Sequence, residues 1–286
     1  MYLSDLFKQK ACPFAIEVFP PKRKSGIEAV YGALHDLCAI GADYISVTYS
    51  AGGSGAREYT GQISRRLKQQ YGVEPLSHLT CVHARPGEVE QELAELQAAG
   101  VQNILALRGD LPPGGGPPPA YAHASDLMQE IARVGGFYLV GACYPEGHPE
   151  SQGLEADIDA LHHKLEAGCG HLVTQLFFDN AKFDRFLSLA RQKGIDCPIE
   201  AGVMPIVKYE QLARTVSLSS ASLPSAFTRW VSRFADDAGA FYEAGIDYAV
   251  RQIRALIENG ADGIHLYAMN NAEVARRIHS GIRDLL

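Results

Sequence analysis

Long apolar runs and basic stripes are both missing from this 286-residue chain. No apolar stretch reaches the length that spans a membrane, and no basic segment followed by an apolar core opens the chain. We therefore expect neither a membrane protein nor a secreted one. The 26 Lys and Arg against 33 Asp and Glu give a net charge of −7, without an arginine-rich run, which argues against nucleic-acid binding.

Paired cysteines are missing as well. The six cysteines form no C-x-x-C pair, and several lie in apolar runs, as Cys81 and Cys143 do. Buried free thiols in a reducing compartment explain this pattern better than a disulfide framework or a zinc site. The sequence therefore predicts a cytoplasmic protein.

A single carboxylate, Glu17, interrupts the first strongly apolar run, which spans Phe14 to Phe19 and stops at Pro20 and Pro21. Burial of an ionised carboxylate is costly, so such sites usually raise the pKa of the group and keep it neutral. A carboxylic acid that is still protonated near neutral pH suits general acid catalysis. The alternative is an ordinary Glu paired with a nearby Arg or Lys.

One unit recurs along the chain: a helical stretch, a glycine turn and a short β-prone run. The turns contain Gly41, Gly100, Gly168 and Gly260. Glycine is favoured just after a helix because it adopts the left-handed conformation without a Cβ penalty. Together with four further apolar runs, the pattern predicts eight strands, at residues 14–19, 44–49, 76–82, 104–107, 137–142, 172–178, 199–206 and 264–268.

Eight alternating strands and helices predict an α/β fold, a (β/α)8 TIM barrel in a single domain of residues 1–286. The long interval between the last two strands leaves room for an extra helix. A doubly wound open sheet is the second choice, because no G-x-G-x-x-G loop follows any strand.

Polar residues gather where the predicted strands end, which is the active-site end of a barrel. They are Glu17, Thr48, His78, Thr80, Arg108, Gly109, Asp110, Tyr144, His148 and, within the sixth strand, Gln175. A proline- and glycine-rich segment, 111–119, follows the fourth strand. We expect it to be a loop over the barrel mouth, suited to a lid or a cofactor wall.

Six motifs in order resemble the methylenetetrahydrofolate reductase family over nearly the whole chain. They are AIEVFPPK (15–22), 46–50, 78–84, ALRGDLPPG (106–114), YPEGHPE (144–150) and TQLFFD (174–179). The resemblance implies a (β/α)8 barrel that binds FAD and transfers hydride from NADH or NADPH to 5,10-methylenetetrahydrofolate, with ping-pong kinetics. It implies no metal, and it suggests a homo-oligomer.

The resemblance also implies residue roles. Glu17 matches the family's general acid, which protonates N10 of the folate, and Asp110 matches the aspartate beside the flavin and the pterin. The positions that match FAD contacts are Thr48, His78, Arg108, Gly109, Asp110, Ala122, Tyr144, His148, Asp157 and Lys164. Without the resemblance, Asp110 is a turn residue, and Asp157 and Lys164 form a solvated helix face.

Substrate contacts and departures follow from the same resemblance. Gln175 matches a glutamine that reaches folate and nicotinamide, and Tyr209 stands where the family usually has a stacking Phe. Asn271 replaces an arginine that helps to bind folate, so another residue is expected to hold the folate carboxylate. Ala160 and His163 also differ from the side chains common at their flavin-side positions.

Two other functions stay open. A metal-dependent barrel hydrolase or aldolase would need His78, His83, His148 and His265 to converge, although the sequence has no H-E-x-x-H motif. A non-catalytic flavin subunit fed by a partner protein is the other possibility, and retention of Glu17, Asp110 and Gln175 argues against it. Without a dinucleotide fingerprint, the sequence does not distinguish NADH from NADPH.

Overall fold

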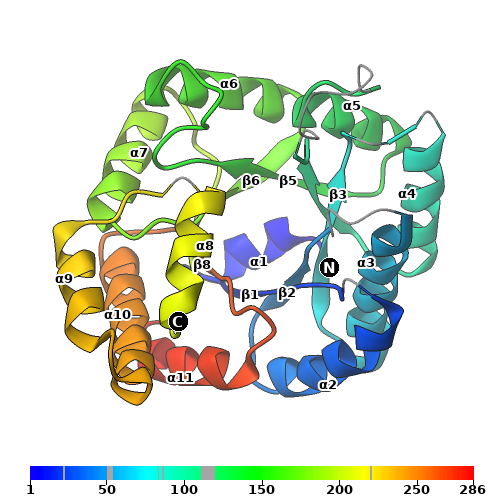
Figure 1. Cartoon of the computed structure of the whole chain (residues 1–286). Helices are drawn as coiled ribbons and strands as arrows, with labels where there is room; N and C mark the ends of the chain where they lie inside the picture. The colour runs from blue at the N-terminus through cyan, green and yellow to red at the C-terminus, as the bar shows by residue number, and fades with distance from the viewer. Residues whose placement is uncertain (22, 50–53, 83, 86, 111–119, 220) are drawn as a thin grey trace.

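The computed structural model describes residues 1–286 except 22, 50–53, 83, 86, 111–119 and 220 (Figure 1). Its strands are β1 (Phe14–Val18), β2 (Tyr44–Val47), β3 (Glu74–Thr80), β4 (Asn103–Leu107), β5 (Tyr138–Cys143), β6 (Cys169–Thr174), β7 (Ile199–Val203) and β8 (Gly263–Leu266). Its α-helices are α1 (Leu3–Gln9), α2 (Ile27–Cys38), α3 (Ser54–Arg66), α4 (Glu88–Ala98), α5 (Ala124–Val134), α6 (Leu154–Glu166), α7 (Asn180–Gln192), α8 (Tyr209–Ser219), α9 (Ser225–Phe234), α10 (Ala238–Glu258) and α11 (Ala272–Ile282).

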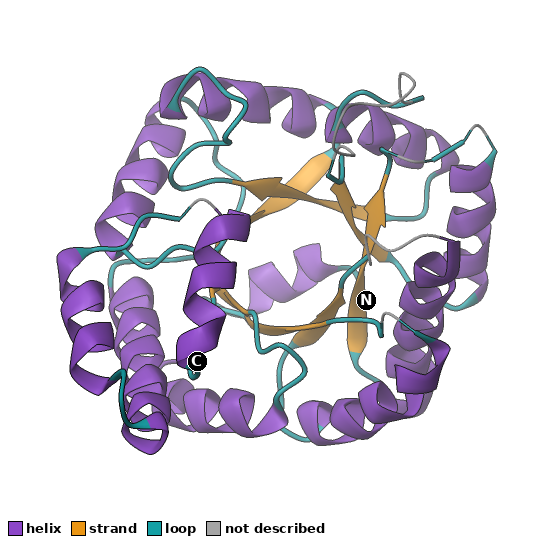
Figure 2. Ribbon diagram, in the orientation of Figure 1, coloured by secondary structure: helices purple, strands orange, loops and turns teal. Residues whose placement is uncertain are grey.

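The eight strands form a closed parallel barrel in chain order, and β1 pairs with both β2 and β8. An outer ring of helices that includes α2 to α7, α10 and α11 surrounds the strands, whereas α1 lies across one end of the barrel (Figure 2). This confirms the predicted (β/α)8 barrel. The glycines of the repeated turn adopt the left-handed conformation that the sequence predicts, with φ of 91°, 77°, 96° and 89° at Gly41, Gly100, Gly168 and Gly260.

Helix α1 closes the N-terminal end of the barrel. Leu3 and Leu6 are buried and pack on the inward-facing Tyr44 and Leu76. The backbone N–H of Leu3 donates to Oδ1 of Asn103, the first residue of β4, at 2.9 Å. The opposite, C-terminal end is therefore the accessible mouth, where a site on this fold is expected.

The long interval between β7 and β8 contains α8, α9 and α10, in agreement with the predicted extra helix. Their apolar side chains, including Phe227 and Phe241, pack on Leu176 and Phe178 in a separate cluster. Five predicted strands, those expected to end at 49, 82, 178, 206 and 268, end at least two residues earlier, at Val47, Thr80, Thr174, Val203 and Leu266. The largest difference is in β6, so Gln175 follows the strand instead of lying within it. The apolar residues after Thr174 are buried against helices and not in the sheet.

No helix in the described ranges combines the length and the apolar composition that crossing a membrane requires.

Candidate active site

Glu17 lies inside the barrel, with only 5% of its surface exposed. Its Oε2 is 3.5 Å from Nε2 of His78 on β3 and 3.5 Å from Nε2 of His265 on β8. No Lys or Arg pairs with it among the residues whose side chains the structure describes, which leaves out Lys24 and Arg57 as well as the ranges given above. Within that part of the chain, the alternative of an ordinary ion pair with Lys or Arg does not hold, and the carboxyl group faces two imidazoles.

The two imidazoles differ in their electrostatic surroundings. Burial lowers the pKa of His78 to about 4, although the carboxylate of Glu17 opposes this. Its Nε2 also lies 2.6 Å from the hydroxyl of Ser46. Burial would lower the pKa of His265 too, but Glu17 and Glu200 outweigh this effect and raise the pKa to about 9. Near neutral pH, therefore, His78 is neutral and His265 is a cation.

A second polar group surrounds the loop from β5 to α6. Arg108 forms two hydrogen bonds to the carboxylate of Glu150, at 2.6 and 2.7 Å, which raise the pKa of the guanidinium. Asp157 accepts a hydrogen bond from the backbone N–H of His148 at 3.1 Å. Lys164 donates to the carbonyl of Ala142, and burial lowers the pKa of its ammonium group.

These contacts bear on the predicted flavin positions. Asp157 and Lys164 turn toward β5 and the loop after it, so they do not form a solvated helix face. Arg108 and Lys164 have the side-chain types that bind a pyrophosphate, and His148 lies on the loop from β5 to α6 between them. Because the side chain of Glu150 is 56% exposed, it can leave Arg108 when an anion binds. The donor set fits a dinucleotide such as FAD.

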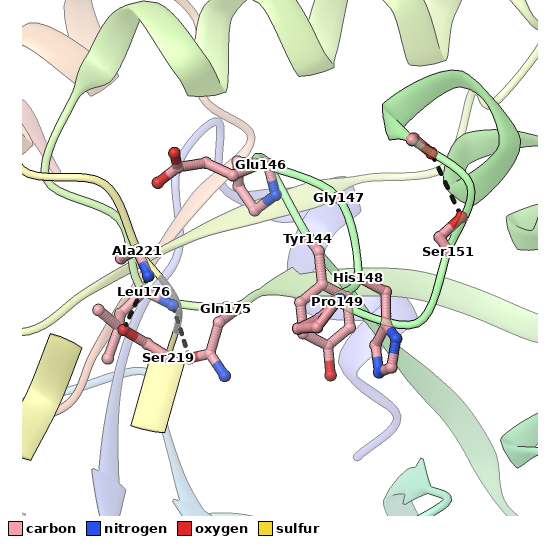
Figure 3. Close-up of a pocket in the computed structure, with 12 residues that line it drawn as sticks. Tyr144, Glu146, Gly147, His148, Pro149, Ser151, Gln175, Leu176, Ser219 and Ala221 are labelled. Atoms are coloured by element: carbon pink, nitrogen blue, oxygen red, sulfur yellow. Dashed lines mark hydrogen bonds between the residues drawn. The ribbon is translucent and has the colours of Figure 1, made fainter. Parts of the chain in front are cut away.

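A cavity of about 300 Å³ lies beside this loop and is lined by Tyr144, His148, Gln175, Leu176 and Ser219, among others. Figure 3 shows the side chains of Tyr144 and Gln175 facing the same space. The rings of Tyr144 and His148 make an edge contact, with centroids 4.7 Å apart, and burial raises the pKa of Tyr144 to about 12. The side-chain oxygen of Gln175 accepts from the backbone N–H of Leu176 at 2.8 Å, and no residue that the structure describes bonds to its amide nitrogen.

Other predicted residues lie around the mouth without lining the cavity. Thr48 is buried at the end of β2, where its N–H donates to the carbonyl of Val18 at 3.0 Å. Gly109 and the exposed Asp110 follow β4, and Ala122 lies in the exposed segment before α5. Tyr209 is 52% exposed at the start of α8.

The departures from the family pattern have clear positions. Asn271 is the N-cap of α11, and its side chain accepts from the N–H of Val274 at 3.1 Å, so a helix cap replaces the expected arginine. Ala160 and His163 lie exposed on α6, where His163 is 3.7 Å from Glu166. None of these three supplies a cation to the cavity.

The sequence prediction missed Glu200, His171 and Tyr44, which lie inside the barrel near His265. Glu200 had a signal, because it is a lone carboxylate in the apolar strand β7, as Glu17 is in β1. The prediction also missed Asn270, whose amide clamps the backbone of Phe19 by two hydrogen bonds of 2.8 and 2.9 Å.

Over the described ranges, no group of three or more His, Cys, Asp or Glu side chains is arranged to hold a metal ion. His83, one of the four histidines of the metal hypothesis, lies outside the described residues, as does the proline-rich segment 111–119.

The chain is similar to known proteins over nearly its whole length. The family model described as "Methylenetetrahydrofolate reductase" matches residues 2–283. The 5,10-methylenetetrahydrofolate reductase of Escherichia coli strain K12 is 33% identical over 264 residues, which cover 92% of this chain and 88% of the relative. The Arabidopsis thaliana protein "Methylenetetrahydrofolate reductase (NADH) 1" is 33% identical over 94% of this chain and 48% of the relative.

Among solved structures, tryptophan synthase from M. tuberculosis superposes with a TM-score of 0.54 at 13% identity, covering 98% of both chains, which supports the barrel fold alone. The extent of the family match and the identity to the bacterial relative are decisive for the family. The chain belongs to the methylenetetrahydrofolate reductase family.

Proposed function

We propose that this chain reduces 5,10-methylenetetrahydrofolate to 5-methyltetrahydrofolate with FAD and a reduced nicotinamide, and that Glu17 is its general acid. The observation that carries the proposal is the carboxyl group of Glu17, 5% exposed in the barrel and without a Lys or Arg partner among the described residues. A carboxyl group shielded from bulk solvent in this way is suited to transfer a proton to a bound substrate.

The substrate holds its one-carbon unit in a five-membered ring between N5 and N10. The proton of Glu17 passes to N10, the C–N10 bond breaks, and an electrophilic iminium remains at N5. A flavin held at this site and already reduced by the nicotinamide would supply the hydride that completes the methyl group. Gln175 would orient the folate through its amide nitrogen, and Tyr209 would stack on the folate.

Residues around the loop from β5 to α6 would hold the cofactor. Arg108 and Lys164 would bind its pyrophosphate, supported by His148 and Asp157, and Tyr144 would contact the flavin. Support comes from the mixture of cationic donors and buried aromatic surface beside one cavity. Asp110 would place a negative charge near the flavin, which disfavours the anionic reduced form and so strengthens its hydride donation.

The nicotinamide and the folate would use the same space in turn, which gives ping-pong kinetics. All six cysteines are free thiols, which is typical of proteins in a reducing compartment, and we therefore place the chain in the cytoplasm. That residues 1–286 act as one domain, and that the protein is a homo-oligomer, are further parts of the proposal.

The visible absorbance spectrum of the purified protein tests the cofactor and the donor together. Flavin bands should appear, bleach anaerobically with NADH or NADPH, and return on addition of methylenetetrahydrofolate. Bands that neither nucleotide bleaches would indicate a partner-fed flavin subunit. A protein without the bands that does not take up added FAD would refute the flavin assignment.

A further inference from the structure

A continuous series of buried polar side chains extends inward from Glu17. His265 Nε2 is 3.5 Å from Glu17, and its Nδ1 is 3.5 Å from Oε2 of Glu200 on β7. The hydroxyl of Tyr44 on β2 donates to the same Oε2 of Glu200. His171 on β6 follows, with Nε2 3.7 Å from Glu200. Glu200, His265 and His171 are fully buried, where a barrel of this type usually has bulky aliphatic side chains.

The neighbours of His265 determine which members of this series carry charge. Its ring is faced by Glu17 on β1, Tyr44 on β2, Glu200 on β7 and Tyr267, the residue after β8. Burial raises the pKa of both tyrosines well above the usual value, so they stay neutral. The two histidines one step farther away, His78 and His171, are neutral as well, since burial lowers the pKa of each to about 4.

Charge can therefore reside only on Glu17, His265 and Glu200 within this cluster. Glu200 accepts a hydrogen bond from the hydroxyl of Tyr44, and its Oε2 lies 3.5 Å from Nδ1 of His265. An imidazolium at His265 then has a counterion that is not Glu17. Because Glu200 and His265 are neutral as a pair, Glu17 is not required as the only buried counterion of the imidazolium.

We propose that Glu200 is a positioning residue for the acid step: it neutralises the His265 cation so that Glu17 holds the proton it gives to folate. The inference rests on the proposed role of Glu17. It also describes the proton balance after that step. When Glu17 has lost its proton to N10, the Nε2 proton of His265 can move to Glu17, and solvent water at the mouth later returns one proton to the cluster.

Without the carboxylate of Glu200, one proton would be shared between Glu17 and His265. Imidazole is the stronger base by about two pKa units, a preference on the order of a hundredfold. The proton would then settle on His265, and Glu17 would become its carboxylate counterion. Glu200→Gln should therefore weaken the acid, although it leaves the space almost unchanged.

The test is the pH dependence of single-turnover oxidation of the reduced enzyme by methylenetetrahydrofolate. In wild type the rate should fall along an alkaline limb as the acid ionises. In Glu200→Gln the midpoint of this limb should move down by about one pH unit or more. In His265→Asn, which keeps the anion and removes the cation, it should move up. The rate of flavin reduction by the nicotinamide should keep its wild-type pH dependence in both variants.

Matched variants separate charge from packing. Glu200→Asp keeps the charge and should hold the midpoint near that of wild type, even with a lower rate. Glu74→Gln removes a carboxylate at the N-terminal end of β3, paired with the N-terminal ammonium at 3.0 Å and with Lys68, and should leave the limb unmoved. If Glu200→Gln does not fold, the upward shift in His265→Asn carries the same test.

An activity-independent readout is the infrared C=O stretch of a protonated carboxyl group at neutral pH. It should be present in wild type and lost in both Glu17→Gln and Glu200→Gln. The inference would be overturned if folded Glu200→Gln kept both the wild-type alkaline midpoint of the single-turnover rate and the wild-type infrared C=O band. A failure of the proposed function looks different, because Glu17→Gln itself would then keep the wild-type rate and limb.

Discussion

The amide of Asn270 should hold the end of β1 in place, and with it the carboxyl group of Glu17. Asn270 follows β8 in the left-handed conformation, with φ of 59°. Its Oδ1 accepts from the N–H of Phe19 at 2.8 Å, and its Nδ2 donates to the carbonyl of Phe19 at 2.9 Å. The clamp is thus two residues from Glu17 and joins β1 to the loop after β8.

The structure sets the size of the expected effect. Loss of two hydrogen bonds to partly buried backbone groups costs about 2 kcal/mol, at about 1 kcal/mol each. Alanine pays roughly 1 kcal/mol more for the left-handed conformation, whereas glycine does not. Asn270→Ala should therefore lower the free energy of unfolding by about 3 kcal/mol and Asn270→Gly by about 2 kcal/mol. A displaced Glu17 should slow folate reduction about tenfold.

Urea denaturation measures the first effect, and stopped-flow oxidation of the reduced flavin measures the second. Asn259→Ala is the matched control, because Asn259 makes one exposed side-chain bond to Asp184 at 3.2 Å and should cost less than about 0.5 kcal/mol. A free energy of unfolding for Asn270→Ala within about 0.5 kcal/mol of wild type would refute a stabilising role for the two hydrogen bonds from Asn270 to Phe19. Equal losses for the Ala and Gly variants would refute the backbone contribution.

Three further predictions concern charge and backbone. Asp110→Asn should make the flavin midpoint potential less negative and slow hydride transfer to folate; a spectroelectrochemical titration that finds the same potential counts against this role. The pKa of His265 is raised to about 9, so protonation of this residue adds to the free energy of unfolding in full below pH 6.5, and this contribution is lost as the pH rises through 9. The pKa of His78 is lowered to about 4, so its contribution to the free energy of unfolding is present above pH 6.5 and is lost as the pH falls through 4. The urea midpoint should therefore be highest near pH 6 to 7. In His265→Asn the midpoint should fall less steeply on the alkaline side. Gly109→Ala should destabilise the protein by about 2 kcal/mol, because φ is 86° and the added Cβ would lie 2.9 Å from Cγ1 of Val82; an unchanged melting temperature would contradict this.

The sequence was sufficient to predict the barrel because local chemistry repeats eight times along it. A helix, a glycine with positive φ and a short β-prone run need no knowledge of distant contacts. The boundaries were less certain, as β6 shows. Leu176, Phe177 and Phe178 are as apolar as a strand, yet only packing decides that they lie outside the sheet: Leu176 and Phe178 pack with α9 and α10, and Phe177 stacks on Phe183 of α7.

The candidate site was predictable only in part, for a related reason. Glu17 was identified because a carboxylate in an apolar strand is unusual in any context. Its partners, His265 and Glu200, depend on how β1, β7 and β8 are aligned when the barrel closes, with Ala15 and Gly202 both level with His265. The sequence does not encode this alignment locally. For the same reason, the inward direction of Lys164 could not be read from its helix alone.

The most direct test of the account is to measure both half-reactions of Glu17→Gln by anaerobic stopped flow. The account predicts that reduction of the bound flavin by the nicotinamide proceeds as in wild type, because that step needs no acid from the barrel interior. It also predicts that reoxidation by methylenetetrahydrofolate is abolished. Equal loss of both half-reactions, or reoxidation at the wild-type rate, would contradict the assignment of Glu17 as the general acid.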